Sequence, residues 1–89
     1  MLKHLNIRVT GRVQGVFFRL AAKDKAESLR LAGVARNEPD GSVRLEIEGE
    51  EADLQRFVDW CRSGSEYAWV KGLEAEEGTV QRLAGFLIR

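Results

Sequence analysis

Hydrophobic and polar residues alternate with a period of two in several parts of the chain. The alternation is clearest over residues 5–10 and 43–48, where Leu, Ile or Val occupies every second position. A period of two places one apolar face on a strand, so both segments predict half-buried strands. Residues 34–37 and 68–76 predict a short strand and a weaker one, and residues 86–88 are the most strand-like part of the last ten.

Two other segments repeat their apolar residues at a spacing of three or four. This spacing predicts a helix over residues 18–31, with Gly33 as its C-terminal breaker, and a second helix over residues 51–62. Between the second and third strands, Glu38-Pro39-Asp40-Gly41 predicts a turn, because Pro fixes one turn dihedral and Asp-Gly suits a hairpin.

The order of these elements predicts the fold class. The predicted order is strand, helix, strand, strand, helix, strand, followed by a last short strand. This is the βαββαβ order of a ferredoxin-like α/β (α+β) sandwich. We expect an antiparallel sheet of four to five strands with two helices on one face. With 89 residues, the chain has room for one domain, 1–89, and one core. The same fold hosts many activities, so it does not predict the chemistry.

Charge is unevenly distributed, although the net charge is zero. Residues 1–45 hold nine Lys or Arg against four Asp or Glu, and residues 46–89 hold five against ten. The N-terminal excess would attract an anion if the fold gathers it on one surface. The alternative is a solvated cationic strand and helix end.

Cysteine and histidine are nearly absent. Cys61 is the only cysteine, so no internal disulfide can form, which favours a reducing, cytoplasmic location. With His4 as the only histidine, no metal cluster is expected. No apolar run approaches the ~20 residues of a membrane span, and the N-terminus lacks the apolar core of a secretory signal.

The segment Gly11-Arg12-Val13-Gln14-Gly15-Val16-Phe17-Phe18-Arg19 joins the first predicted strand to the first predicted helix. Glycine lets backbone N–H groups converge at a helix N-terminus, where phosphate or carboxylate binds, and Arg19 can add a fork of donors. The segment lacks the spacing of a P-loop or a dinucleotide-binding loop. Two interpretations remain open at this point: an anion cradle, or a strand-to-helix turn that needs glycine for its geometry.

The same nine residues resemble the loop that characterises the acylphosphatases. Gly33-Val34-Ala35-Arg36-Asn37 resembles the second landmark of that family, and Gly85-Phe86-Leu87-Ile88-Arg89 resembles its last strand. The likeness covers essentially the whole chain. It implies a small hydrolase, acting without metal or cofactor on the carboxyl-phosphate bond of acyl phosphates such as acetyl phosphate.

The resemblance also implies which residues form the site. The backbone of Gln14, Gly15, Val16, Phe17, Phe18 and Arg19 would hold the phosphoryl oxygens, Arg19 would clamp them, and Asn37 would orient the attacking water. The partner would be a small-molecule acyl phosphate, with inorganic phosphate as product and competitive inhibitor. We expect a cytoplasmic monomer that binds neither nucleic acid nor membrane.

Three positions depart from the family pattern. Val34-Ala35 stands where a large aromatic residue is common, which concerns local packing more than chemistry. Ala22 stands where threonine is common, so activity would fall if that hydroxyl supports the site. Phe17 stands where many members have a small residue.

Other interpretations are weaker. We expect His4 to be an exposed strand residue and Cys61 to pack on the apolar face of the second helix. A non-catalytic anion-binding or nucleic-acid-binding module shares this element order, but the third strand has no aromatic residue and presents Glu46 and Glu48, which would repel phosphates. A degenerate relative of the acylphosphatase-like domain of carbamoyl-transfer maturation proteins is the remaining alternative.

Overall fold

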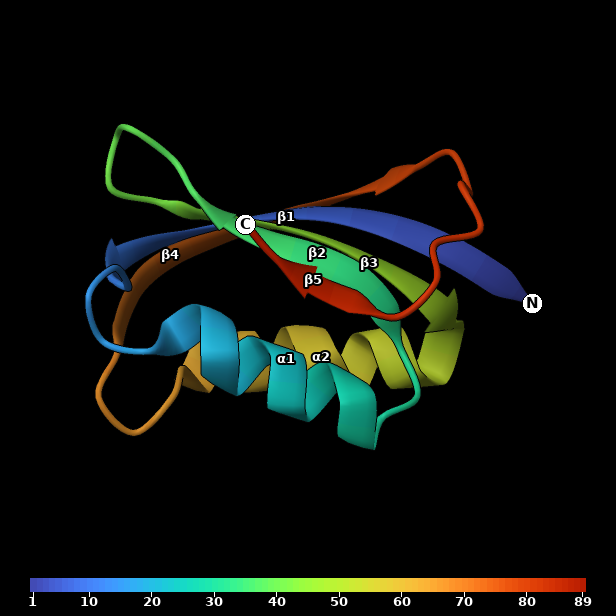
Figure 1. The fold of residues 1–89 in the computed structure, drawn as a ribbon, viewed down its shortest axis with the longest axis horizontal. Coiled ribbons are helices and arrows are strands. Elements are labelled where there is room, and N and C mark those ends of the chain that lie inside the picture. The colour runs from blue at the N-terminus through green and yellow to red at the C-terminus, as the bar shows by residue number, and fades with distance from the viewer.

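Five strands form one sheet, and two helices cover one of its faces (Figure 1). The computed structural model describes residues 1–89. The elements follow the order β1 (Leu2–Arg12), α1 (Phe18–Ser28), β2 (Ala32–Asn37), β3 (Val43–Glu50), α2 (Glu51–Ser63), β4 (Trp69–Gly78) and β5 (Phe86–Ile88). The ferredoxin-like order predicted from the sequence is confirmed.

The strands lie in the order β4-β1-β3-β2-β5. Strand β1 pairs antiparallel with β3 and β4, and β2 pairs antiparallel with β3. The exception is β5, which pairs parallel with β2 at the edge of the sheet. Because β4 and β5 are the two edge strands, the segment between them must pass from one edge of the sheet to the other.

The hydrophobic core lies between the sheet and the helices. Alternation holds as predicted: Ile7 and Val9 of β1 and Leu45 and Ile47 of β3 are at most 1% exposed. The predicted burial of Cys61 in α2 is also confirmed. No helix is long and apolar enough to cross a membrane.

Helix α1 ends earlier than predicted, and Gly33 is not its breaker. The helix stops at Ser28, and Arg30 adopts a left-handed conformation with φ 59°. The Leu31 N–H then donates to Ala26 O and the Arg30 N–H to Glu27 O, which is a Schellman ending built without glycine. Gly33 lies inside β2, where a β-carbon would come within 2.2 Å of the Glu46 carbonyl oxygen.

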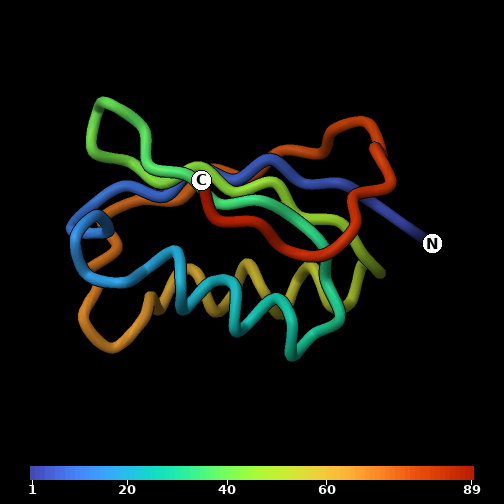
Figure 2. The backbone as a smooth tube through the Cα atoms, in the orientation of Figure 1, coloured from blue at the N-terminus to red at the C-terminus, as the bar shows by residue number.

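Glu48 ties the β4–β5 connection to the sheet. Its neighbour Ile47 faces the core, so Glu48 faces the opposite side of β3. There its carboxylate accepts hydrogen bonds from the backbone N–H groups of Gln81 and Leu83, the latter at 2.6 Å. Figure 2 follows this connection from one edge of the sheet to the other. The connection leads directly into β5.

His4 is buried, and the prediction that it is exposed was wrong. It pairs across the strands with Glu48, and its Nδ1 lies 2.8 Å from Glu48 Oε2. The segment that Glu48 holds covers this end of the sheet, which leaves His4 0% and Glu48 2% exposed. Burial alone raises the pKa of the Glu48 carboxyl, but the hydrogen bonds from Gln81, Leu83 and His4 outweigh it and hold the pKa below its usual value.

We predict that Glu48→Gln destabilises the protein and removes part of its sensitivity to acid. The amide cannot accept all of the hydrogen bonds that the carboxylate accepts, so the free energy of unfolding should fall by roughly 2–4 kcal/mol at about pH 7. A carboxyl whose pKa is lowered by folding contributes stability above its unfolded pKa and loses it as pH falls through the folded value. The stability difference between the two proteins should therefore shrink towards about pH 3.

Denaturant unfolding at a series of pH values measures this difference. Glu76→Gln is the matched control, since Glu76 is an exposed carboxylate of β4 that forms no ion pair. We expect that variant to follow the wild type at every pH. A constant gap between wild type and Glu48→Gln over the acid range would contradict the prediction.

Candidate functional site

The site begins at a bulge near the end of β1. The pairing of β1 with β4 shifts register between Thr10 and Gly11. Gly11 has φ 127°, and a β-carbon there would come within 2.2 Å of the Trp69 carbonyl oxygen, so only glycine fits. The partners pass from Gly72 to Val70, so the extra residue is Lys71 of β4, and the close approach of β4 to Gly11 lies just before the loop that leads to α1.

Two buried side chains fix the ends of this loop. Val13 and Phe18 are each 1% exposed, whereas Gly15 and Phe17 between them are exposed. Phe18 is the first residue of α1 and stacks on Trp60 of α2, with ring centroids 5.6 Å apart. The loop is therefore anchored by the core at both ends while its middle remains at the surface.

The backbone donors of this loop have no partner in the protein. No N–H group from Gln14 to Leu20 donates a hydrogen bond to a protein acceptor. Gly15 and Phe17 adopt left-handed conformations, with φ 73° and 61°, which is the alternation that turns successive N–H groups towards one point. Helix α1 has no side-chain cap and no acidic residue in its first turn, so its positive dipole end is also uncompensated.

Arg19 adds a full positive charge to the same place. It lies in the first turn of α1, and its Nη1 donates to the main-chain oxygen of Arg89, just after β5. This is the only hydrogen bond of the Arg19 side chain within the protein. Because guanidinium has five N–H donors, the rest of the fork is free to bind an anion.

Asn37 is the last residue of β2, at the start of the β2–β3 turn. Gln14 reaches from the loop to this turn, where its Nε2 donates to the carbonyl oxygens of Glu38 and Ser42, each at 2.8 Å. The far side of the turn is braced by Asp40, which accepts from the Ser42 N–H and hydroxyl. The Ser42 hydroxyl, and then the Arg8 guanidinium, hold the pKa of the Asp40 carboxyl well below its usual range.

A pocket of about 250 Å³ brings most of the predicted residues together. Among the predicted residues, those that line it are Gly15, Phe17, Phe18, Arg19 and Asn37. The predicted Gln14 and Val16 do not line it, and the Gln14 side chain turns to the hairpin instead. Ala22, the departure one turn after Arg19, is fully buried and lies outside the pocket.

Sequence reasoning missed three of the lining residues: Val13, Leu20 and Ile88. Leu20 could have been suspected, since it is an apolar residue off the apolar stripe of the predicted helix. Nothing in the sequence places Ile88 here, because β5 reaches the site only through its parallel pairing with β2.

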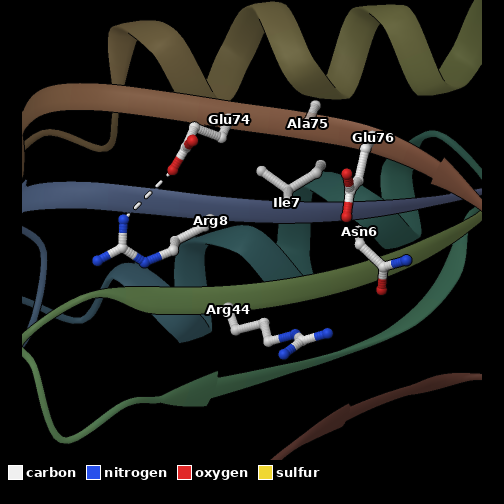
Figure 3. A pocket seen from close by; sticks show the side chains of 7 residues that line it. All are labelled: Asn6, Ile7, Arg8, Arg44, Glu74, Ala75 and Glu76. Atoms are coloured by element: carbon white, nitrogen blue, oxygen red, sulfur yellow. Dashed lines mark hydrogen bonds and ion pairs between the residues drawn. The ribbon is translucent and has the colours of Figure 1, made fainter.

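A larger hollow lies elsewhere, on the sheet face opposite the helices (Figure 3). Its volume is about 530 Å³, and its charged lining consists of Arg8, Arg44, Glu74 and Glu76. The two cations and two carboxylates balance, and Arg8 already pairs with Glu74 and Asp40. This hollow therefore has no excess charge to attract an anion, and the smaller pocket is the candidate site.

The single cysteine and the possible metal-ligating residues were the other candidates for a site. Burial raises the pKa of the Cys61 thiol well above its usual range, so it stays protonated within the core. No group of three His, Cys, Asp or Glu is placed where it could hold a metal ion.

Comparison with known proteins identifies the family. The model of the family described as Acylphosphatase matches residues 5–88. The chain belongs to the acylphosphatase family. An acylphosphatase of Nocardioides sp. is 43% identical over 89 residues, which is all of this chain and 90% of that protein.

Two solved acylphosphatase structures have the same fold over at least 93% of their length. The structure from Coxiella burnetii has a TM-score of 0.95 at 34% identity, covering 99% of this chain and 93% of that one. The crystal structure from Bacillus subtilis has a TM-score of 0.94 at 37% identity, covering 100% and 99%. The resemblance seen in the loop and in the Gly33–Asn37 segment therefore extends over the whole chain.

We predict that inorganic phosphate binds in the smaller pocket and that Arg19→Lys weakens this binding. Lysine keeps the charge but loses the planar fork, so the dissociation constant should rise by roughly 10-fold or more. Isothermal calorimetry measures the affinity, and the phosphate-induced rise in Tm reports it independently. Arg44→Lys, in the larger hollow, should bind phosphate as the wild type does. Equal weakening in both variants would place the anion outside the smaller pocket.

Proposed function

We propose that this chain hydrolyses acyl phosphates to carboxylate and phosphate, with Arg19 and Asn37 as catalytic residues. The observation that carries the proposal is the pocket where unpartnered N–H groups, Arg19 and Asn37 meet. Membership of the acylphosphatase family supports the reaction class. The assignment of each residue is argued below from its position.

The phosphoryl group would occupy the cradle formed by the loop backbone. N–H groups between Gln14 and Arg19 would donate to its oxygens, and Arg19 would donate with the part of its guanidinium that is free. Phosphoryl transfer leaves little covalent work for the protein, and charge develops on the oxygens in the transition state. Donors that are already fixed in place stabilise that charge without reorganising, because Val13 and Phe18 anchor the loop.

Asn37 would hold the attacking water. Its side-chain amide makes no hydrogen bond within the protein, lines the pocket and offers both a donor and an acceptor. The water oxygen forms a bond to phosphorus while the phosphorus–oxygen bond to the acyl group breaks. The carboxylate leaves with that electron pair, and the proton of the water passes to the phosphate or to solvent. A carboxylate is a good leaving group, so no strong general acid is required.

Two alternatives are not favoured. For a nucleic-acid-binding module, the open face of the sheet would have to attract phosphates, but it carries Glu74 and Glu76 beside its arginines. For a degenerate, non-catalytic relative, Arg19 or Asn37 should be replaced or displaced from the pocket, and both residues are present there.

The finer expectations from the sequence remain part of the proposal. Inorganic phosphate would act as product and competitive inhibitor, because it carries the same oxygens as the phosphoryl group. The protein would work as a monomer in the cytoplasm, consistent with a single, buried cysteine that needs no oxidising compartment.

We predict that the wild type hydrolyses benzoyl phosphate in the presence of EDTA and that Asn37→Ala lowers kcat on the order of 10²-fold or more. Loss of ultraviolet absorbance follows the reaction. Asn6→Ala, on the open face of the sheet, is the matched control and should retain full activity. Wild-type turnover in a folded Asn37→Ala variant would remove Asn37 from the mechanism. A folded wild type without turnover would refute the proposed reaction.

We predict that Gln14→Met lowers kcat about 10-fold, because Asn37 loses its tie to the loop. The stability cost should be small, about 1 kcal/mol, since the carbonyls of Glu38 and Ser42 keep backbone donors within the turn. The inhibition constant of phosphate should change less than kcat, because the cradle donors are unaltered. Gln55→Met, on the surface of α2, controls for the substitution itself. Unchanged kcat in Gln14→Met would show that the turn holds Asn37 without this tie.

A further inference from the structure

Beyond its anion-binding end, the smaller pocket has apolar walls. Phe17, Leu20 and Ile88 line it from the loop, from α1 and from β5, and their side chains are 74%, 50% and 39% exposed. Arg19 is the only charged residue in the lining. Three exposed apolar side chains from separate segments therefore line a pocket whose only charged residue is Arg19. We call these three residues the apolar rim.

Stability does not account for Phe17. Its backbone is left-handed, with φ 61°, a conformation that costs a residue with a β-carbon roughly 1–2 kcal/mol. Because its ring is mostly exposed, the burial of apolar surface offsets little of that cost. A bulky residue that is strained and exposed next to a pocket points to a role in binding.

We propose that the apolar rim binds the acyl group and makes this protein selective for acyl phosphates with an apolar, aryl or alkyl, acyl group. The proposal rests on the proposed function, because it assumes that the phosphoryl group occupies the cradle. In an acyl phosphate the carbonyl carbon is two bonds from phosphorus, so the acyl group must leave the cradle past the rim. The pocket of about 250 Å³ is smaller than most ligand sites, so the rim contacts whatever extends from it.

The rim also disfavours acyl groups that carry a second charge. A carboxylate placed against Phe17, Leu20 and Ile88 would lose water without gaining a partner, which is costly. Arg19 cannot serve as that partner, since it faces the phosphoryl group and donates to the Arg89 main-chain oxygen. An acetyl group would be accepted but would cover little of the rim.

Strand β5 offers a matched pair of positions for a test. Ile88 lines the pocket, whereas its neighbour Leu87 is 53% exposed and does not. Successive side chains of a strand point to opposite faces of the sheet. Leu87 and Ile88 are adjacent and have side chains of the same size, so they differ mainly in the face to which the side chain points. Both Ile88→Ser and Leu87→Ser replace an exposed aliphatic side chain of β5 by serine. Only Ile88→Ser removes a residue of the apolar rim.

The kinetic experiment compares kcat/KM for benzoyl phosphate with kcat/KM for acetyl phosphate. The intrinsic reactivity of each mixed anhydride is the same for every variant, so it cancels when ratios are compared between proteins. Loss of a hydrophobic wall should lower the benzoyl-to-acetyl ratio by roughly 10-fold in Phe17→Ala and by several-fold in Ile88→Ser. The ratio should stay at the wild-type value in Leu87→Ser.

A binding experiment tests the rim without any turnover. Phenylphosphonate, methylphosphonate and inorganic phosphate carry similar anions with different substituents, and calorimetry gives their affinities. We expect wild type to bind phenylphosphonate at least several-fold more tightly than methylphosphonate, Phe17→Ala to lose that difference, and Ile88→Ser to reduce it while it keeps its phosphate affinity.

The outcomes separate the rim from the reaction. Turnover of both substrates with a ratio that Phe17→Ala leaves unchanged would overturn the rim and leave the proposed function intact. The wild type could instead turn over neither substrate but still bind phenylphosphonate more tightly than methylphosphonate, with this difference lost in Phe17→Ala. That result would overturn the proposed function and support the rim. Equal loss of the ratio in Leu87→Ser and Ile88→Ser would also overturn the rim, because the effect would then not depend on the pocket.

Discussion

The site depends on a stretch of backbone that must be rigid although its N–H groups donate no hydrogen bonds within the protein. From Gln14 to Leu20 no N–H group has a protein acceptor, and the helical hydrogen bonds of α1 reach back only to the carbonyl oxygen of Phe17. Their position comes from side chains at the two ends, since Val13 and Phe18 are buried in the core. Packing and the hydrogen bonds of the Gln14 side chain therefore hold the loop without using its N–H groups, which stay free for an anion.

The same constraint explains why distant segments converge on the loop. A cluster of unpartnered donors beside Arg19 is positively polarised, and groups placed around it must be acceptors or be neutral. The β2–β3 turn is tied by the Gln14 side chain, which uses carbonyl acceptors and leaves the loop N–H groups alone. Strand β5 contributes an apolar side chain, Ile88, and the main-chain oxygen of Arg89. No carboxylate side chain lines the pocket, so none competes there with a substrate.

The elements of the fold and the loop at the centre of the site could be predicted because their signals are local. Alternation in β1 and β3 predicted the buried faces of Ile7 and Leu45. The glycines before Arg19 left a cradle and a plain turn open, and only the resemblance of the loop to that of the acylphosphatases favoured the cradle. One error was local and the other came from a tertiary contact. A left-handed Arg30 ended α1 where a glycine was expected, and the β4–β5 connection covered His4, which lies on what would otherwise be an exposed face. The residue pattern of a strand does not indicate whether a later segment of the chain will cover it.

The acidic residues of β3 show how the covering β4–β5 connection can bury a position that the sequence pattern predicts to be exposed. Glu46 and Glu48 alternate with apolar residues, which reads as two solvated positions on the open face. In the structure Glu46 remains partly exposed, whereas Glu48 is buried and holds Gln81 and Leu83 by their N–H groups. That attachment guides the chain towards β5, and β5 carries one wall of the pocket. A residue on the far face of the sheet thus belongs to the construction of the site, even though it never approaches the substrate.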